Sequence, residues 1–308
     1  MTKVLGEATP VLTRRDTLGE GPAYDRVGGR LLWVDIHGHR VHELVADGDG
    51  AWRAGESWMM DAPVSAVVPH RDGGLVVAIG CEVRRLDADG TLTTIARIDT
   101  GGVSARLNDC KCDPRGRLLG GWLAYDLSEP GRLCRIDPDG TVTTLLEDVA
   151  LSNGLGWSPD GATFYFTDTP TNGIDAFDYD LDAGTISNRR RLITIRRGEG
   201  SPDGMCVDDE GCIWTATLYS RQVRRYSPGG ELVGVVDTPA HLVTSCAFGG
   251  PDGGELFITS IGEEIPRALP ESLAIPDEVI DASNANPSIG LLLSCRPGVT
   301  GPPAIPFG

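Results

Sequence analysis

The sequence predicts an all-β protein, a six-bladed β-propeller with four antiparallel strands in each blade. Tight-turn signals built from Gly, Asp and Pro recur along the whole chain, and strand-like runs between them leave no room for long helices. The turn glycines fall at intervals of 42 to 50 residues, at Gly28, Gly73, Gly116, Gly161, Gly211 and Gly253. Six near-equal steps of this length match the repeat of one propeller blade.

The composition agrees with a fold made of many short strands. The 308 residues include 41 Gly and 21 Pro but only 6% aromatic residues, which is typical of short elements joined by tight turns. A hydrophobic content of 40% is enough for a packed interior. Because all-β propellers commonly exceed about 200 residues as one unit, we expect residues 1–308 to form a single domain.

The strands of each blade can be placed in order along the chain. The second strand of each blade is an apolar run after the turn glycine: 31–36, 75–79, 118–123, 164–167, 213–217 and 256–259. The third strand alternates polar and apolar residues, as a half-exposed strand does: 40–44, 83–86, 132–136, 174–177 and 223–226. The sixth unit has no obvious fourth strand near the C-terminus. The N-terminal run 8–14 is expected to supply that strand and close the ring, which removes free sheet edges.

One polar position repeats at the start of the innermost strand of each blade. Counting back eight residues from each turn glycine gives Glu20, Ser65, Asn108, Asn153, Asp203 and Ser245. A shared register should place all six around one end of the central channel. Strand starts are often polar because they satisfy local backbone groups, and this explains the two serines.

Local backbone bonding does not explain two carboxylates and two amides on one axis. Crowded carboxylates repel each other unless a cation lies between them. Ligand sets made only of oxygen suit a hard divalent ion such as Ca²⁺, Mg²⁺ or Mn²⁺. The register therefore predicts a metal site at this end of the channel.

The loops between second and third strands should lie on the same face and form the pocket wall. Among them is a long segment, 262–287, which contains Pro and Glu without clear periodicity. We expect it to be a loop insertion at the pocket face, either a lid or a surface insertion.

The charge of the chain narrows the classes of partner. A net charge of −17 repels phosphate backbones and anionic lipid, so we expect neither a nucleic-acid nor a membrane partner. Residues 1–16 contain no apolar signal region, and no apolar run is long enough to span a bilayer, so a cytoplasmic location is expected. The eight cysteines show no zinc-type spacing. No coiled-coil pattern or apolar helical face argues for assembly, so we expect a monomer or a weak homo-oligomer.

Several short motifs resemble the senescence-marker-protein/gluconolactonase family, also called the regucalcin family. They keep their order and spacing from about residue 16 to residue 260, and in series they are specific. The motifs are Leu18-Gly-Glu-Gly-Pro22, Arg106-Leu-Asn-Asp109, Ser152-Asn-Gly-Leu155, Pro202-Asp-Gly-Met205 and Thr244-Ser-Cys-Ala-Phe-Gly-Gly250.

The resemblance implies a function as well as a fold. It implies one divalent metal ion bound by Glu20, Asn153 and Asp203, with substrate contacts from Arg106 and Asn108. Ca²⁺ is the favoured ion, and Mg²⁺, Mn²⁺, Zn²⁺ or Fe²⁺ are alternatives. Family members typically open lactones of aldonic acids, so the expected partner is a small-molecule lactone. The metal would act as a Lewis acid and Asp203 as the general base.

The substrate side of the site departs from the family pattern. Where relatives commonly have Gly-Thr-Met, this chain has Gly121-Trp122-Leu123, and Asp126 aligns with a substrate-binding Glu of some relatives. We interpret Asp126 as a substrate-binding residue and expect this shorter carboxylate, beside a new Trp, to reshape the sugar site. Two other functions stay open: a promiscuous metal-dependent esterase or organophosphate hydrolase, and a non-catalytic calcium-binding regulatory protein.

Overall fold

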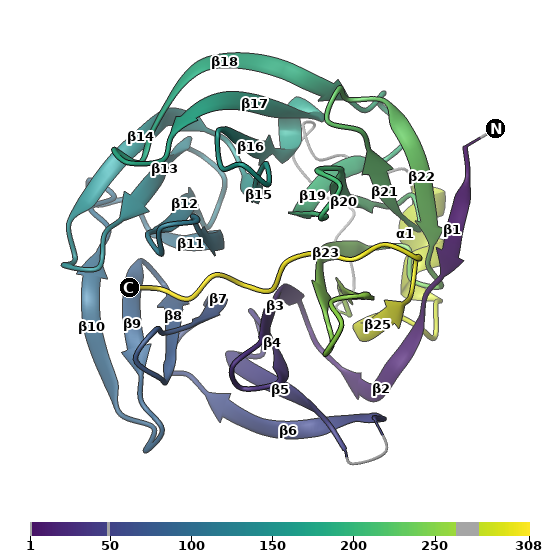
Figure 1. Ribbon diagram of the computed structural model, residues 1–308, viewed down its shortest axis with the longest axis horizontal. Helices are drawn as coiled ribbons and strands as arrows, with labels where there is room; N and C mark the ends of the chain where they lie inside the picture. Colours follow the sequence, from purple (N-terminus) through teal and green to yellow (C-terminus); the bar gives the residue numbers. More distant parts are fainter. Residues whose placement is uncertain (1, 48–49, 263–276) are drawn as a thin grey trace.

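The structure, a computed structural model, describes residues 2–47, 50–262 and 277–308. Six blades, each a sheet with four antiparallel strands, surround a central channel (Figure 1). In the description of each blade below, the strand named first is the innermost one, which lines the channel. Blade 1 contains β3 (Gly19–Asp25), β4 (Arg30–Asp35), β5 (Arg40–Ala46) and β6 (Trp52–Met59). Blade 2 contains β7 (Val64–Pro69), β8 (Leu75–Ile79), β9 (Glu82–Leu86) and β10 (Leu92–Arg97). Blade 3 contains β11 (Ala105–Cys112), β12 (Leu118–Ala124), β13 (Gly131–Ile136) and β14 (Val142–Val149).

The second half of the ring repeats this pattern. Blade 4 contains β15 (Ser152–Trp157), β16 (Thr163–Asp168), β17 (Gly173–Asp180) and β18 (Thr185–Thr194). Blade 5 contains β19 (Ser201–Val207), β20 (Ile213–Leu218), β21 (Gln222–Tyr226) and β22 (Leu232–Asp237). Blade 6 contains β23 (Val243–Gly249), β24 (Glu255–Ser260), β25 (Leu291–Cys295) and β2 (Thr9–Arg15). The predicted six-bladed, all-β propeller is confirmed.

The N-terminus closes the ring as the sequence predicts. Strand β2 pairs antiparallel with β25, so the N-terminal part of the chain supplies the fourth strand of blade 6. The preceding strand β1 (Val4–Glu7) pairs parallel with β22 and adds a fifth strand to the blade 5 sheet. This parallel strand is not evident from the sequence repeat, because it lies outside it.

The hairpin turns explain the glycine repeat. The turn glycines 73, 116, 161, 211 and 253 have φ between +67° and +85°, a left-handed conformation that favours glycine. Blade 1 differs, because there the left-handed residue is Gly29, with φ +63°, rather than Gly28. Four residues separate β3 from β4, whereas five separate the first two strands of each other blade.

The innermost strands share a second irregularity, a β-bulge at the level of the predicted polar ring. In β3, β11, β15 and β19 two residues lie opposite one residue of the neighbouring strand. The bulged pairs are Gly21-Pro22, Asn108-Asp109, Asn153-Gly154 and Asp203-Gly204. A bulge changes the direction of side chains locally, so it interrupts the alternation of faces at the level of the polar ring residues.

The hydrophobic core lies between the blades. Six buried apolar clusters can be distinguished, and each joins two adjacent blades. Trp122 belongs to the cluster between blades 2 and 3 and is 3% exposed. The expectation that this Trp reshapes the sugar site is therefore wrong: its ring packs into the interface between two blades, on the same face of β12 as Leu118.

The two ends of the channel differ. The inner strands begin at one end, here called the site end. The C-terminal segment 299–308 crosses the opposite end, here called the tail end, and runs across the centre of the ring in Figure 1. Its backbone amides bond carbonyls of three blades: Ala304 N to Tyr24 O, Phe307 N to Pro69 O and Gly308 N to Gly116 O, at 3.0, 2.8 and 3.0 Å.

The expected insertion 262–287 begins where β24 ends, at the site end. Residues 263–276 of this predicted lid or insertion lie outside the described residues. Residues Asp277–Asn284 form α1, which buries Ile280 and Ser283. None of the helices that the structure describes has the length and apolar character required to cross a bilayer.

Candidate metal centre

Four of the six predicted ring residues, Glu20, Asn108, Asn153 and Asp203, are connected at the site end through hydrogen bonds and close charges. All six are buried, with exposed fractions from 1% for Ser65 to 7% for Glu20 and Asn108. Five buried polar residues form the ring cluster: Glu20, Asn108, Asp109, Asn153 and Asp203. They come from four blades, and each lies in or beside one of the bulges described above.

A chain of hydrogen bonds fixes the two amides of the ring cluster. Asn108 Nδ2 donates to Asn153 Oδ1 and to Ser152 O, both at 2.7 Å. Asn153 Nδ2 donates to Thr169 Oγ1 at 2.8 Å, and that hydroxyl donates to Pro202 O at 2.9 Å. Because Asn153 Nδ2 has its acceptor in Thr169, the orientation of the amide is set and its oxygen is presented to the cluster.

The carboxylates of the ring cluster are crowded and desolvated. Burial, and then the neighbouring Asp109 carboxylate, raise the pKa of Glu20 to about 8. Burial, and then the charges of Glu20 and Asp109, raise the pKa of Asp203 well above its ordinary value. Asp203 Oδ1 has no hydrogen-bond partner among the described residues. Without a cation, this arrangement favours protonated acids over ionised ones.

Asp109 is a member of the cluster that the sequence analysis does not find. Strict strand alternation would turn it away from the channel, since Asn108 points inward. The bulge at Asn108-Asp109 removes that alternation, and Asp109 is 6% exposed with its Oδ2 unpartnered in the described part of the chain. Burial raises its pKa, and the Lys111 ammonium opposes the rise. Only the position of the bulge could have revealed it.

Glycines allow the blades to approach at this level. A Cβ on Gly154 would lie 2.6 Å from Asp203 O, and one on Gly204 would lie 2.1 Å from Ser245 Oγ. Each inner strand therefore packs its bulge directly against the next blade. This close approach is what brings side chains of four blades to one axis.

The donor set fits a hard divalent cation. Glu20, Asn153 and Asp203 offer two carboxylates and one fixed amide oxygen, and Asp109 adds a third carboxylate nearby. A cation would satisfy the unpartnered Asp203 Oδ1 and offset the burial and the carboxylate repulsion that raise the pKa values of Glu20 and Asp203. Ca²⁺, Mg²⁺ and Mn²⁺ prefer oxygen ligands of these types.

Arg106 lies beside the cluster and is buried. Its Nη1 donates to Asn108 Oδ1 at 2.5 Å and to Leu107 O at 3.1 Å, and the residue is 9% exposed. Burial lowers the pKa of the guanidinium, while the Tyr125 and Glu20 charges oppose that shift. Arg106 is therefore a buried cation and not a surface residue of its strand. A guanidinium has five N–H donors, so the Nη1 bonds leave others for a ligand.

Asp126 differs from the other predicted site residues. It lies in the exposed loop between β12 and β13, and its Oδ1 accepts hydrogen bonds from Ser128 N at 3.1 Å and Ser128 Oγ at 2.7 Å. These bonds lower the pKa of its carboxyl group. The structure places Asp126 in this loop turn, and no bond joins it to Arg106 or Asn108, so its substrate-binding role stays a prediction.

A second buried group of potential metal ligands lies where the chain enters blade 1. This clasp cluster consists of Asp16, Asp35 and His42. The Asp35 carboxylate accepts hydrogen bonds from the backbone amides of Thr17 and Leu18, each at 2.9 Å. Asp16 Oδ2 accepts a hydrogen bond from Trp33 Nε1 at 2.7 Å. Each acid therefore already has hydrogen-bond donors within the protein.

His42 completes the clasp cluster in a defined tautomer. Arg14 Nη1, which can only donate, lies 2.7 Å from His42 Nδ1, so that nitrogen accepts. The proton is then on Nε2, which faces Asp16 Oδ1 at 3.3 Å. With its acids bonded and its imidazole oriented, the clasp cluster serves to attach the N-terminal segment to blade 1.

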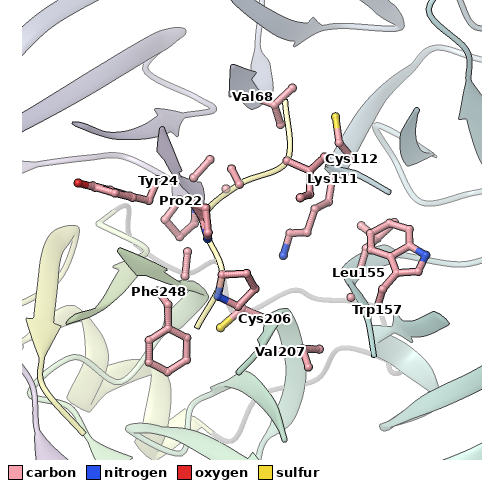
Figure 2. Close-up of a pocket in the computed structure, with 18 of the residues that line it drawn as sticks. Pro22, Tyr24, Val68, Lys111, Cys112, Leu155, Trp157, Cys206, Val207 and Phe248 are labelled. Carbon is pink, nitrogen blue, oxygen red and sulfur yellow. The ribbon is translucent and has the colours of Figure 1, made fainter. Parts of the chain in front are cut away.

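Below the ring cluster the channel widens into a cavity of about 320 Å³. Its wall consists of the inner strands past the ring, and its floor is formed by tail residues 302–305. Figure 2 shows the Lys111 amine pointing into this space, with the sulfur atoms of Cys112 and Cys206 and the ring of Trp157 around it. Lys111 Nζ donates to Met205 O at 2.5 Å, so its side chain spans the channel from blade 3 to blade 5.

Comparison with known proteins identifies the family. The profile described as SMP-30/Gluconolactonase/LRE-like region matches residues 18–262. The chain belongs to this family. Regucalcin of Xenopus laevis is 37% identical over 274 residues, which cover 85% of this chain and 90% of that protein.

Solved structures of the family agree with the fold. A calcium-binding regucalcin from Agrobacterium tumefaciens has a TM-score of 0.86 at 27% identity, covering 100% of this chain and 99% of that one. A gluconolactonase from Xanthomonas campestris has a TM-score of 0.68 at 25% identity, covering 82% and 85%. The family resemblance of the sequence motifs is confirmed, and the family includes proteins named for both lactone hydrolysis and calcium binding.

Proposed function

We propose that this protein is a lactonase that hydrolyses a small sugar-type (aldonic acid) lactone with the help of one divalent cation, Ca²⁺ being favoured. The observation that carries the proposal is the ring cluster, in which Glu20, Asn153 and the unpartnered Asp203 Oδ1 converge beside buried Arg106. Membership in a family that includes gluconolactonases supports the choice of reaction.

Glu20, Asn153 and Asp203 would hold the cation. Ca²⁺ takes about 6–8 oxygen ligands, so three protein ligands leave positions for substrate and water. The ion would supply polarisation of the lactone carbonyl and a lower pKa for a water molecule. The hydrogen-bond chain through Asn108 and Thr169 keeps the Asn153 oxygen in place for this role.

Asp203 would act first as the general base and then as the general acid of the reaction. Ring opening adds water across the carbonyl carbon to ring oxygen bond and yields a carboxylate, a hydroxyl group and one proton. Asp203, ionised when a cation balances its neighbours, would accept the proton from the attacking water and return it to the departing ring oxygen.

Arg106 would stabilise the charge that develops on the substrate. The addition step places negative charge on the former carbonyl oxygen, and a buried guanidinium stabilises it more than an exposed one because water is excluded. Asn108 holds Arg106 through Oδ1 and Asn153 through Nδ2, so it positions both the anion-stabilising residue and a metal ligand.

Chelation and reconstitution test this function. We expect acid release from gluconolactone-type substrates to be lost in excess chelator and restored by Ca²⁺ or another divalent ion. Aryl esters and phosphotriesters serve as comparison substrates, since faster turnover of either would favour the esterase or organophosphate hydrolase. Turnover of lactones that is unaffected by complete metal removal would contradict the proposal.

A non-catalytic calcium-binding function is the second candidate. It is supported by the relatives named regucalcin and by the calcium-binding description of the Agrobacterium protein. Tight calcium binding by calorimetry, without turnover of lactones or esters, would favour this candidate over the lactonase.

A further inference from the structure

Two cysteines of adjacent blades are in contact beside the channel cavity. Cys206 lies in β19 of blade 5 and Cys246 in β23 of blade 6, and their sulfur atoms are 3.7 Å apart. These inner strands pack against each other along their length. An oxidant can join two thiols at this separation into a disulfide with a local shift of the two strands and no change of fold.

The two thiols differ in access. Cys206 is half-buried and lines the cavity, where Figure 2 shows its sulfur atom among the lining side chains. Cys246 is 1% exposed, and its Sγ lies 3.5 Å from Trp214 O. Burial raises the pKa of the Cys246 thiol well above its ordinary value, an effect that the nearby Lys111 ammonium opposes. A small reagent in the cavity therefore meets Cys206 first.

We propose that Cys206 and Cys246 form an oxidation site that hydrogen peroxide converts into a disulfide joining blades 5 and 6. In the first step the Cys206 thiolate displaces hydroxide from peroxide, giving a sulfenic acid and, after proton transfer, water. In the second step Cys246 sulfur attacks the sulfenic sulfur and releases a second water. The two thiols lose two electrons and the peroxide gains them, so the step balances.

The disulfide would constrain the two strands that carry Cys206 and Cys246. A disulfide requires the sulfurs to approach to about 2.05 Å, so β19 and β23 would be drawn together at the level of the cavity. The bridge would close a loop of 40 residues and join blade 5 to the blade that closes the ring. Asp203 lies three residues before Cys206 on the same strand, so oxidation also constrains the strand that carries a ring-cluster acid.

Peptide mapping of the oxidised protein tests the proposal directly. The full chain is treated with a small molar excess of hydrogen peroxide, alkylated and digested without reduction. We expect loss of two of the eight thiols, a peptide pair linked through Cys206 and Cys246, and full reversal by dithiothreitol. The melting temperature of the oxidised protein should rise by several degrees.

Two serine variants and one control separate the roles of the thiols. In Cys246→Ser the linked pair should be absent, and Cys206 should progress to sulfinic acid because the resolving thiol is gone. Cys206→Ser should prevent both products. Cys295→Ser, which changes another half-buried cysteine in blade 6, should leave the linked pair unchanged. Full retention of all thiols, or a bridge between other cysteines in the wild type, would overturn the proposal.

Discussion

The ring cluster and the clasp cluster are two buried groups of acids at the site end of the same propeller, and their environments differ. In the clasp cluster Asp35 accepts hydrogen bonds from backbone amides and Asp16 Oδ2 accepts one from Trp33 Nε1, while Asp16 Oδ1 makes no hydrogen bond among the described residues and lies 3.3 Å from His42 Nε2. In the ring cluster Asp203 Oδ1 has no partner in the described structure, and the pKa values of Glu20 and Asp203 are raised.

The difference shows how a structural acid is distinguished from a binding one. Both clusters have ligand types and burial compatible with a metal ion, so composition does not separate them. Blade 4 repeats the bonding of Asp35 at Asp168, whose carboxylate accepts the amides of Ala150 and Leu151 at 3.2 and 2.9 Å. Acids of this kind accept hydrogen bonds from the backbone amides of a loop that recurs between blades. The ring-cluster acids also accept neighbouring backbone amides, but burial and neighbouring carboxylates raise the pKa values of Glu20 and Asp203, and an external cation would offset both effects.

The largest expected effect concerns Asp203. Asp203→Asn removes the proposed general base and a charged metal ligand while keeping the side-chain shape. We expect kcat/KM for the lactone to fall by about 10²–10⁴-fold, the usual contribution of general base catalysis. Initial rates under metal saturation measure this loss.

Asp16→Asn in the clasp cluster is the matched control. It should leave kcat/KM for the lactone and calcium affinity unchanged. It should lower the free energy of unfolding by about 1–3 kcal/mol, because a buried hydrogen-bond network is weakened. A loss of metal affinity in Asp16→Asn equal to that in Asp203→Asn would show that the two clusters have been assigned the wrong roles.

The next effect is a pH-dependent change in stability at Glu20. Its pKa in the folded protein lies above the ordinary value of 4.5, so ionising it destabilises the metal-free protein as pH rises from about 4.5 through 8. In chelator, Glu20→Gln should be more stable than the wild type by roughly 1–3 kcal/mol above pH 8, and equally stable near pH 4.

Saturating calcium should make the wild type more stable than Glu20→Gln. Saturating calcium stabilises the folded wild type through linkage, whereas Glu20→Gln lacks a charged ligand and should gain less. Denaturant unfolding across pH, with and without calcium, measures both effects. A wild type that stays more stable than Glu20→Gln at high pH in chelator would contradict the assignment of Glu20 as a crowded, cation-requiring acid.

A smaller effect is expected at Thr169, which touches the ring cluster only through Asn153. Thr169→Val keeps the buried shape but removes the hydroxyl that accepts from Asn153 Nδ2. We expect about 10-fold weaker calcium binding, typical for loss of a group that orients a metal ligand. Isothermal titration calorimetry measures it. In Thr171→Val, whose Oγ1 donates to Asp168 O outside the cluster, affinity should not change.

The smallest effect is expected at Asp126. The side chain is exposed and bonded within its own loop, so Asp126→Asn should change KM for the lactone by at most about threefold, the range of ordinary surface substitutions. A much larger rise in KM at constant kcat would show that the loop closes over substrate and that the family role of this position is retained.

The sequence is sufficient for the propeller and for much of the ring cluster. In blades 2 to 6 the turn glycines mark equivalent positions because each hairpin requires a left-handed residue, so a constant count from them reaches equivalent positions on the inner strands. In blade 1 the left-handed residue is Gly29, and the count from Gly28 reaches Glu20, one residue before the bulge. Glu20, Asn153 and Asp203 are found in this way. The closure by β2 follows from the missing strand of the sixth unit.

The remaining features depend on departures from the repeat. Asp109 faces the cluster because of a bulge, and a bulge changes which face a residue occupies without a signal in residue type. Trp122 lies on a strand that the sequence predicts, but the packing between blades 2 and 3 decides that its face of the strand is buried there. The parallel strand β1 and the tail that closes the cavity lie outside the repeat, so no register argument reaches them.

Anomalous diffraction from crystals grown with Mn²⁺ tests the central claim most directly, because it locates the ion independently of activity. The ring cluster predicts one dominant peak at about 2.0–2.6 Å from carboxylate oxygens of Glu20 and Asp203 and from Asn153 Oδ1, the range of hard-cation to oxygen distances. A dominant peak within the clasp cluster of Asp16, Asp35 and His42, or an empty ring cluster in protein that binds Mn²⁺ in solution, would contradict it.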